Sequence, residues 1–331
     1  MAPEPAPHGG TGSPDVGAKL YAKYCGFCHG DAGEGYVSPA ANALANQAFL
    51  AAVDDSFLDQ AIALGRPGTK MSAWGVKVGG PLDDDDVADL IAFIRTWQTE
   101  PTADLGAPPT GGDKTAGAAL YANQCASCHG GEGEGTSLAL SLNNPVFLDS
   151  ASDAFLAYAI RLGRPGTTMQ AYGETLTEAE IADLVAWIRS LQTPIDPNPP
   201  VKPPKTDMVL NPDGPEPDFT VGDEFISCDD VKAALDAGSK MILLDARPQS
   251  DYAFEHITGA ANIPFFEIET RYTEVPEDVW VIAYCGCPHD ESGILARGLR
   301  AQGHKKVAVL DEGYFVWKEK GYGVTVDGVE Q

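Results

Sequence analysis

The sequence has no hydrophobic run long enough to cross a lipid bilayer. A membrane-spanning helix needs about 20 consecutive apolar residues, and no stretch of this 331-residue chain approaches that length, although 44% of its residues are hydrophobic. The opening stretch, Met1 to Gly10, also lacks the basic and apolar regions of a signal peptide. We therefore interpret residues 1–13 as a flexible leader from which a signal or lipoprotein anchor is missing.

Basic residues are also scarce. The chain has 22 Lys and Arg against 48 Asp and Glu, which gives a formal net charge of −26. Such a chain would repel a polyanion, so a nucleic-acid partner is excluded. The excess of negative charge has two open interpretations. One is solubility alone, and the other is steering of the basic face of a redox partner protein toward the molecule.

Only seven cysteines are present, and four of them fall into two motifs of one type. These are Cys25-Gly-Phe-Cys28-His29 and Cys125-Ala-Ser-Cys128-His129. Cys-x-x-Cys-His is the attachment motif of haem c, in which the cysteines bind the haem and the histidine ligates its iron. Zinc is the alternative, but it would need further ligands, and residues 1–193 contain no other cysteine. The sequence therefore predicts two covalently bound haem c groups, with His29 and His129 as iron ligands.

Methionine is rare as well, with five in the chain. Within residues 14–193 the two methionines are Met71 and Met169, and each follows a Gly-Arg-Pro-Gly-Thr sequence typical of a loop. We predict that they are the second axial ligands, because His/Met ligation is common in cytochromes c and raises the haem potential. The alternative is that both methionines pack in a core. Two filled axial positions would favour electron transfer over binding of small ligands.

The first half of the chain is an internal duplication. Gly17 to Cys25 matches Gly117 to Cys125, and Leu64 to Met71 matches Leu162 to Met169. Near the end of each copy, residues 86–94 and 180–188 place apolar side chains at helical spacing. Thr177 and Glu180 form a capping-box pattern, and the acidic run 83–86 suits a helix start.

Residues 14–100 and 113–193 each resemble a class I cytochrome c domain in the haem motif, the methionine loop and the last helix. The resemblance implies a small helical fold in which Gly17 and Tyr21 pack near Phe93. The corresponding residues of the second copy are Gly117, Tyr121 and Trp187. It also implies that the carbonyl of Pro39 orients His29, whereas the second copy has no proline there. Arg66 and Arg164 are candidates for contacts to haem propionates, with a plain surface role as the alternative.

Two linkers separate the domains. Residues 101–112 are rich in proline and glycine, and residues 194–217 are rich in proline. After residue 218 the pattern changes to short apolar runs at 241–245, 279–284 and 306–310, with helical stretches at 227–235 and 292–302. Buried runs that alternate with helices predict an α/β domain with a parallel sheet. The fold class expected is therefore multidomain: two mainly-α domains followed by one α/β domain.

Cys285 directly follows the predicted strand 279–284, and a helix comes next. Such a position lowers the pKa of a thiol and makes it reactive; a buried inert cysteine is the alternative. Residues 218–331 resemble a rhodanese-homology domain. The pieces that match are Leu244-Asp245-Ala-Arg247, Glu255-His256-Ile257 with Gly259-Ala260 and Asn262-Ile263-Pro264, Tyr284-Cys285, and Val309 to Trp317. The resemblance implies that Cys285 is a catalytic nucleophile that carries sulfur as a persulfide.

The loop after Cys285 departs from the rhodanese pattern, because it contains Asp290 and Glu291 and no arginine. Thiosulfate, a dianion, is therefore less suitable than a neutral or chain-like sulfur species or a protein persulfide. Cys287 is a candidate resolving thiol or persulfide carrier. His289 either tunes the thiolate or is solvated, and His256 and Cys228 are expected to be structural.

Together these features predict a periplasmic or otherwise exported dihaem electron-transfer protein coupled to a sulfur-binding cysteine, which acts in the oxidation or transfer of reduced or sulfane sulfur. Its expected partners are a cytochrome or terminal oxidase with a basic docking face, and a reduced sulfur compound or protein persulfide. Contact with a membrane would come only through a missing anchor. One alternative is a plain dihaem carrier whose rhodanese domain serves docking or sensing. Another is a sulfurtransferase whose haems serve a separate partner.

Overall fold

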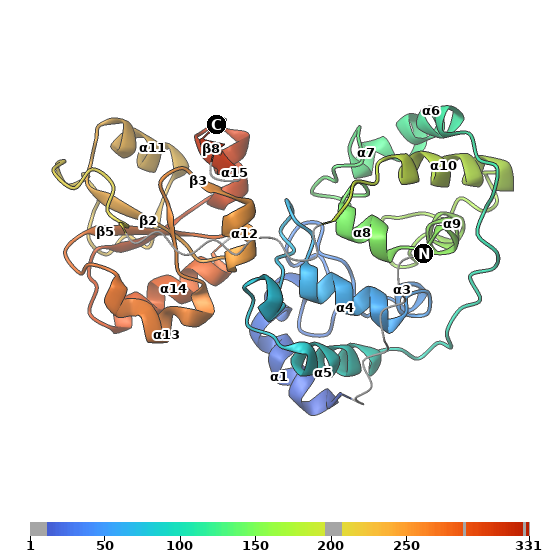
Figure 1. Ribbon diagram of the computed structural model, residues 1–331, viewed down its shortest axis with the longest axis horizontal. Coiled ribbons are helices and arrows are strands. Elements are labelled where there is room, and N and C mark those ends of the chain that lie inside the picture. Colours follow the sequence, from blue (N-terminus) through green and yellow to red (C-terminus); the bar gives the residue numbers. More distant parts are fainter. Residues whose placement is uncertain (1–11, 196–206, 287–288, 327–328, 331) are drawn as a thin grey trace. The chain divides into compact units, whose positions relative to one another are not determined.

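The computed structural model describes residues 12–195, 207–286, 289–326 and 329–330 (Figure 1). The chain divides into two compact units. The first comprises residues up to Arg66 and from Leu82 to Pro197, and the second comprises Pro67–Pro81 and the residues from Asn198 onward. The segment that carries Met71 thus groups with the second unit. The predicted domain boundaries stay predictions, and each unit is described by itself.

The first unit contains the same series of helices twice, as the internal duplication predicts. The first series is α1 (Pro14–Tyr24), α2 (Gly26–His29), α3 (Gln47–Leu50), α4 (Asp55–Leu64) and α5 (Asp84–Arg95). The second series is α6 (Lys114–Gln124), α7 (Ala126–His129), α8 (Pro145–Ser150), α9 (Asp153–Leu162) and α10 (Glu178–Ser190). The capping box predicted at Thr177 and Glu180 is confirmed. The acidic run before α5 also begins a helix, and Asp83 and Asp86 form a second capping box there.

In each series the first and last helices cross closely at a glycine. A Cβ atom at Gly17 would lie 2.0 Å from the backbone oxygen of Asp89, so no larger residue fits at this crossing. The ring of Tyr21 packs 5.4 Å from that of Phe93. This confirms the packing that the resemblance implied.

The second copy crosses in the same way. A Cβ atom at Gly117 would lie 2.0 Å from the oxygen of Asp183. Tyr121 stacks on Trp187 with ring centroids 3.8 Å apart.

The two series pack on one another within the first unit through an aromatic cluster. Phe57 of α4 lies 6.3 Å from Phe147 and 5.4 Å from Phe155, measured between ring centroids. Asn46 donates a hydrogen bond of 2.8 Å to the carbonyl of Pro165. The linker 101–112 therefore connects two bodies that share apolar contacts.

The second unit is built on a five-stranded sheet in the order β1-β6-β5-β2-β4, with every neighbouring pair parallel. Its strands are β1 (Phe225–Ile226), β2 (Met241–Asp245), β4 (Ala261–Asn262), β5 (Trp280–Tyr284) and β6 (Val307–Leu310). Every residue of β2, β5 and β6 is buried, as expected for strands covered on both faces. The three predicted strands and the parallel sheet are confirmed.

Helices and short helical turns cover this sheet, with α11 on one side and α13 and α14 on the other (Figure 1). They are α11 (Cys228–Asp236), α12 (Gln249–Phe254), η2 (Phe265–Glu267), α13 (Ile268–Arg271), η3 (Tyr272–Glu274), α14 (Asp290–Ala301) and α15 (Gly313–Glu319). A small antiparallel sheet joins β3 (Glu255–Ile257), β7 (Val324–Val326) and β8 (Val329–Glu330). The turn η1 (Val76–Val78) lies in the Pro67–Pro81 segment. Across the described ranges, no helix combines the length and the apolar character needed to pass through a bilayer.

Candidate functional sites

Each Cys-x-x-Cys-His motif forms a single helical turn. Cys25 caps α2, and its carbonyl accepts hydrogen bonds from the N–H groups of Cys28 (3.1 Å) and His29 (3.0 Å). The carbonyl of Cys125 accepts the same two bonds at 3.1 and 3.0 Å. The fold therefore brings together the two cysteines and the histidine of each motif, as a covalent haem requires.

A backbone carbonyl orients each motif histidine. The Nδ1 atom of His29 lies 2.9 Å from the carbonyl oxygen of Asn42, and that of His129 lies 2.9 Å from the oxygen of Leu140. A carbonyl only accepts, so Nδ1 carries the proton and Nε2 keeps its lone pair for a metal. Burial lowers the pKa of both histidines, which favours this neutral form.

The prediction that Pro39 orients His29 is therefore wrong. Any residue type can supply the carbonyl that accepts the bond, and here Asn42 supplies it. This also explains why the second copy needs no proline at the aligned position, since Leu140 plays the same part. A backbone acceptor has no side-chain signature, so sequence reasoning could not locate it.

The side chains of these two turns are of the types that bind haem c. Burial raises the pKa of Cys25 to about 12 and that of Cys125 to about 11, so both remain thiols that can form thioethers. Beside them, Tyr21 and Tyr121 donate hydrogen bonds of 2.7 Å to the carbonyls of Gly30 and Gly130, just after each motif histidine. Two thiols and one oriented neutral imidazole are the groups that a haem c uses.

The two methionine loops adopt one conformation in both copies. The N–H of Met71 donates to Thr69 Oγ1 at 3.2 Å, and that of Met169 donates to Thr167 Oγ1 at 3.1 Å. Met169 lies in the same unit as His129, and Met71 lies in the second unit. The axial roles of both methionines stay predictions.

Arg66 and Arg164, which occupy the same position of the repeat, are only partly exposed. Arg66 lies over the rings of Phe57 and Phe147, and Arg164 lies over that of Phe155. Burial lowers the pKa of each to about 10. Contact with a haem propionate and the alternative of a plain surface role both stay predictions for these two arginines.

In the second unit, Cys285 directly follows β5, and its side chain is buried, with 1% exposed. Its Sγ lies 3.2 Å from the hydroxyl of Ser292 in the first turn of α14. The predicted strand–cysteine–helix arrangement is thus present, and the nucleophile candidate lies at a helix N-terminus, where the helix dipole favours a thiolate. Cys287 falls outside the described residues.

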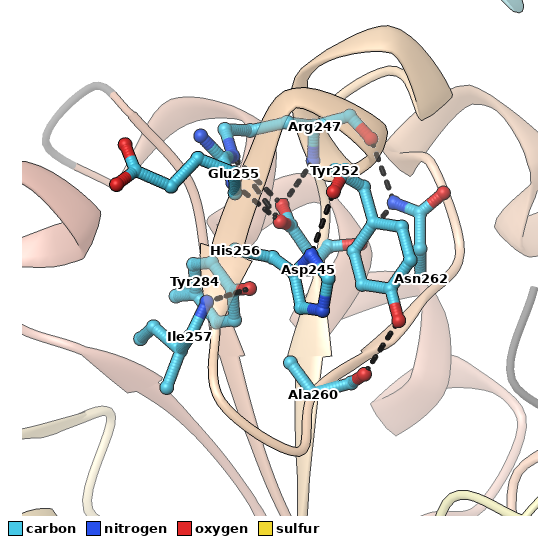
Figure 2. Close-up of polar contacts among 9 residues, drawn as sticks. All are labelled: Asp245, Arg247, Tyr252, Glu255, His256, Ile257, Ala260, Asn262 and Tyr284. Carbon is cyan, nitrogen blue, oxygen red and sulfur yellow. Dashed lines mark hydrogen bonds and ion pairs between the residues drawn. The ribbon is translucent and has the colours of Figure 1, made fainter. Parts of the chain in front are cut away.

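A buried ion pair stands at the carboxyl end of β2, next to this site (Figure 2). Arg247 Nη2 lies 2.6 Å from Asp245 Oδ2, with 6% and 0% of the two side chains exposed. The same guanidinium donates to the carbonyl of Glu255 at 2.7 Å and covers the ring of Tyr314 at 4.1 Å. Burial alone would lower the pKa of Arg247, but Asp245 raises it well above its ordinary value. Arg247 is therefore a fixed charge already engaged with Asp245.

His256 and Cys228 have the packed environments expected of structural residues. His256 stacks on Tyr252 at 3.9 Å, and its Nδ1 lies 2.7 Å from the Tyr252 carbonyl (Figure 2). Cys228 is buried in the first turn of α11, and burial raises its pKa to about 12.

His289 immediately precedes α14 and contacts two residues that lie far away in the sequence. Its Nε2 lies 2.6 Å from the carbonyl oxygen and 3.0 Å from Oδ1 of Asp311, and its ring packs 4.2 Å from that of Phe225. Its φ of +69° is uncommon for a residue other than glycine. The side chain is thus 36% exposed and also hydrogen-bonded. Asp311 and Phe225 lie far from His289 in the sequence, so no local signal could predict these contacts.

Two known protein families match this chain, one in its helical part and one in its α/β part. Residues 12–94 and 112–188 match the family described as cytochrome c oxidase, cbb3-type, subunit III, and residues 227–320 match the rhodanese-like domain. The chain carries two cytochrome c domains and a rhodanese-like domain. The predicted fold class and both resemblances are thereby confirmed. Cytochrome c domains imply haem c and redox partner proteins, and they are typically exported.

The chain also has curated relatives and solved structural neighbours. It is 32% identical over 97 residues to the putative sulfur carrier protein YrkF of Bacillus subtilis, which is 29% of this chain and 51% of that protein. It is 33% identical over 81 residues to the uncharacterized protein YqhL of the same organism, which is 24% of this chain and 64% of that protein. The chain thus spans about half to two thirds of the length of these two relatives.

Two solved structures are similar to parts of this chain. The thiosulfate sulfurtransferase of Pseudomonas aeruginosa has a TM-score of 0.29 and 29% identity, covering 31% of this chain and 20% of that one. Cytochrome cL of Methylophaga aminisulfidivorans has a TM-score of 0.22 and 31% identity, covering 24% of this chain and 53% of that one.

Proposed function

We propose that this cytochrome c–rhodanese fusion is an exported redox protein of sulfur metabolism. Cys285 takes up sulfur from a reduced sulfur compound and holds it as a persulfide. Residues Cys25, Cys28, Cys125 and Cys128 bind two haem c groups, with His29, Met71, His129 and Met169 as axial ligands. The observation that carries the proposal is the position of Cys285 at the start of α14, with its Sγ 3.2 Å from the Ser292 hydroxyl, in a chain that also carries two oriented motif histidines.

The sulfur chemistry belongs to Cys285. With hydrosulfide as the substrate, a new S–S bond forms, and Cys285–SH and HS⁻ give Cys285–S–SH, one proton and two electrons. The helix N-terminus beside Sγ stabilises the thiolate that must form first. When bound, the two haems supply one-electron acceptors. Two cytochrome domains match the two electrons that one such S–S bond releases.

The acidic surface supports a basic redox partner, such as a cytochrome or terminal oxidase. With a net charge of −26, the protein would attract a positively charged docking face at low ionic strength. The proposed association therefore weakens as salt rises.

Sulfur uptake at Cys285 is tested by mass spectrometry of the full chain after anaerobic incubation with inorganic polysulfide. We expect a mass gain of one or more sulfur atoms on the peptide that contains Cys285, removed by cyanide, and no gain at that position in Cys285→Ser. Cys228→Ser is the matched control and should leave the sulfur on Cys285 unchanged, because Cys228 is buried with a raised pKa. If Cys285 takes up no sulfur, the chain is better explained as a dihaem carrier with a non-catalytic rhodanese-like domain.

A further inference from the structure

A second carboxyl group lies in the Cys285 site, and sequence reasoning did not single it out as buried. Glu291 precedes Ser292 in the first turn of α14, and 3% of its side chain is exposed. A carboxyl group so deeply buried ordinarily pairs with a cation or stays neutral. The protonation state of Glu291 therefore depends on the charged groups around it.

Four ionisable groups interact with Glu291 from three parts of the unit. Cys285 follows β5, Asp251 lies on α12, and Asp245 and Arg247 lie at the end of β2. Arg247 is the one cation among these four, and its guanidinium is held by both oxygens of Asp245 and by the Glu255 carbonyl. Arg247 therefore does not neutralise an ionised Glu291.

The consequence for Glu291 is that its neutral form is favoured. Burial, reinforced by Cys285 and Asp251, raises the pKa of Glu291 well above its ordinary value. Burial also raises the pKa of Asp251 to about 6. Near neutral pH the Glu291 carboxyl thus carries a proton that it can donate.

The reacting sulfur contacts the residue that follows this acid. The Ser292 hydroxyl, 3.2 Å from Cys285 Sγ, belongs to the residue next to Glu291. A hydroxyl both donates and accepts hydrogen bonds, so Ser292 can relay a proton between the thiol and the start of α14. The first turn of α14 thus carries the acid and the relay at consecutive positions, and the relay contacts the nucleophile.

We propose, building on the function proposed above, that Glu291 is the general acid of the Cys285 site when the sulfur arrives from the persulfide of an alkyl thiol, R–S–SH. Cys285 Sγ attacks the outer sulfur, and a new S–S bond forms while that of the donor breaks. The electron pair leaves on R–S⁻, which takes the proton of Glu291. The proton of the Cys285 thiol restores Glu291 by way of Ser292. In sum, Cys285–SH and R–S–SH give Cys285–S–SH and R–SH, with no electron released.

Thiosulfate fits this site poorly for the same reasons. It brings two negative charges to a place that holds the carboxyl groups of Asp245 and Asp251, and the one arginine among the groups that interact with Glu291 is paired with Asp245. Its leaving group, sulfite, is a weak base that needs no proton from an acid. An alkyl thiolate is a strong base and gains most from a proton donor.

The test compares two donors in single-turnover reactions of the full chain under anaerobic conditions. One donor is glutathione persulfide, and the other is an aromatic persulfide whose thiol is a far stronger acid. General acid catalysis is worth about 100-fold or more, so Glu291→Gln should slow loading of Cys285 from glutathione persulfide by about that factor. With the aromatic donor, whose leaving thiolate needs no proton, the variant should keep the rate of the wild type within a few-fold.

Asp290→Asn is the matched control, because it removes a carboxylate one residue away that is only partly buried; it should load Cys285 at the wild-type rate from both donors. An equal loss with both donors in Glu291→Gln would show a structural role and overturn the inference. So would a full rate with glutathione persulfide, or wild-type loading from thiosulfate as fast as from the persulfide. If no donor loads wild-type Cys285, the proposed function itself fails, which is a different result.

Discussion

Asp245→Asn is expected to lower the free energy of unfolding of the rhodanese-like unit by about 3–5 kcal/mol, the cost of leaving one member of a buried ion pair without its partner. The substitution keeps the shape of the side chain but removes the charge that holds Arg247. Both side chains are almost fully buried, and Arg247 Nη2 lies 2.6 Å from the carboxylate. The guanidinium cannot shed its charge and would stay buried without a counter-ion.

The measurement is denaturant unfolding of the full chain, followed by the fluorescence of its tryptophans. Asp229→Asn is the control. Asp229 pairs with Lys320 at 2.7 Å, but 61% of its side chain is exposed, so its loss should cost no more than about 1 kcal/mol. An equal, small effect of both substitutions would mean that the Asp245–Arg247 pair does not stabilise the unit.

Met169→Ala is expected to lower the midpoint potential of one haem by on the order of 0.2 V, a part of the roughly 0.8 V over which axial ligands set haem potentials. Methionine ligation raises the potential of a cytochrome c, and alanine offers no ligand. The second haem should keep its potential, because its predicted ligand is Met71.

An anaerobic redox titration followed in the visible spectrum would resolve the two haems before and after the substitution. Thr168→Ala is the control, because Thr168 is exposed and adjacent to Met169, and it should leave both midpoints in place. If Met169→Ala moves neither midpoint, Met169 packs in its loop and does not bind iron.

The regular elements of this protein follow closely from local sequence. The apolar runs 241–245 and 279–284 became β2 and β5 because a fully buried parallel strand needs apolar side chains on both faces. The capping pair Thr177 and Glu180 placed the start of α10 for an equally local reason. The haem motifs were predicted from spacing alone, because two thiols and a histidine on one turn serve few other purposes.

The parts that sequence reasoning missed depend on contacts between distant residues or on the backbone. The carbonyl of Asn42, which orients His29, could come from any residue type. His289 seemed solvated because its partner Asp311 is 22 residues away. From the sequence, Glu291 is one of two acids in the loop after Cys285, whereas the fold buries it in the first turn of α14, and this burial raises its pKa.

The central part of the proposed function is that oxidation of sulfur at Cys285 supplies electrons to the cytochrome c domains. The most direct measurement is the visible spectrum of the oxidised full-length protein while sulfide is added without oxygen, for the wild type and for Cys285→Ser. We expect the haems of the wild type to become reduced, at up to two electrons for each sulfur bound to Cys285. The haems of the variant should stay oxidised over the same time. Reduction at the same rate in both proteins, or no reduction in either, would contradict the proposed function.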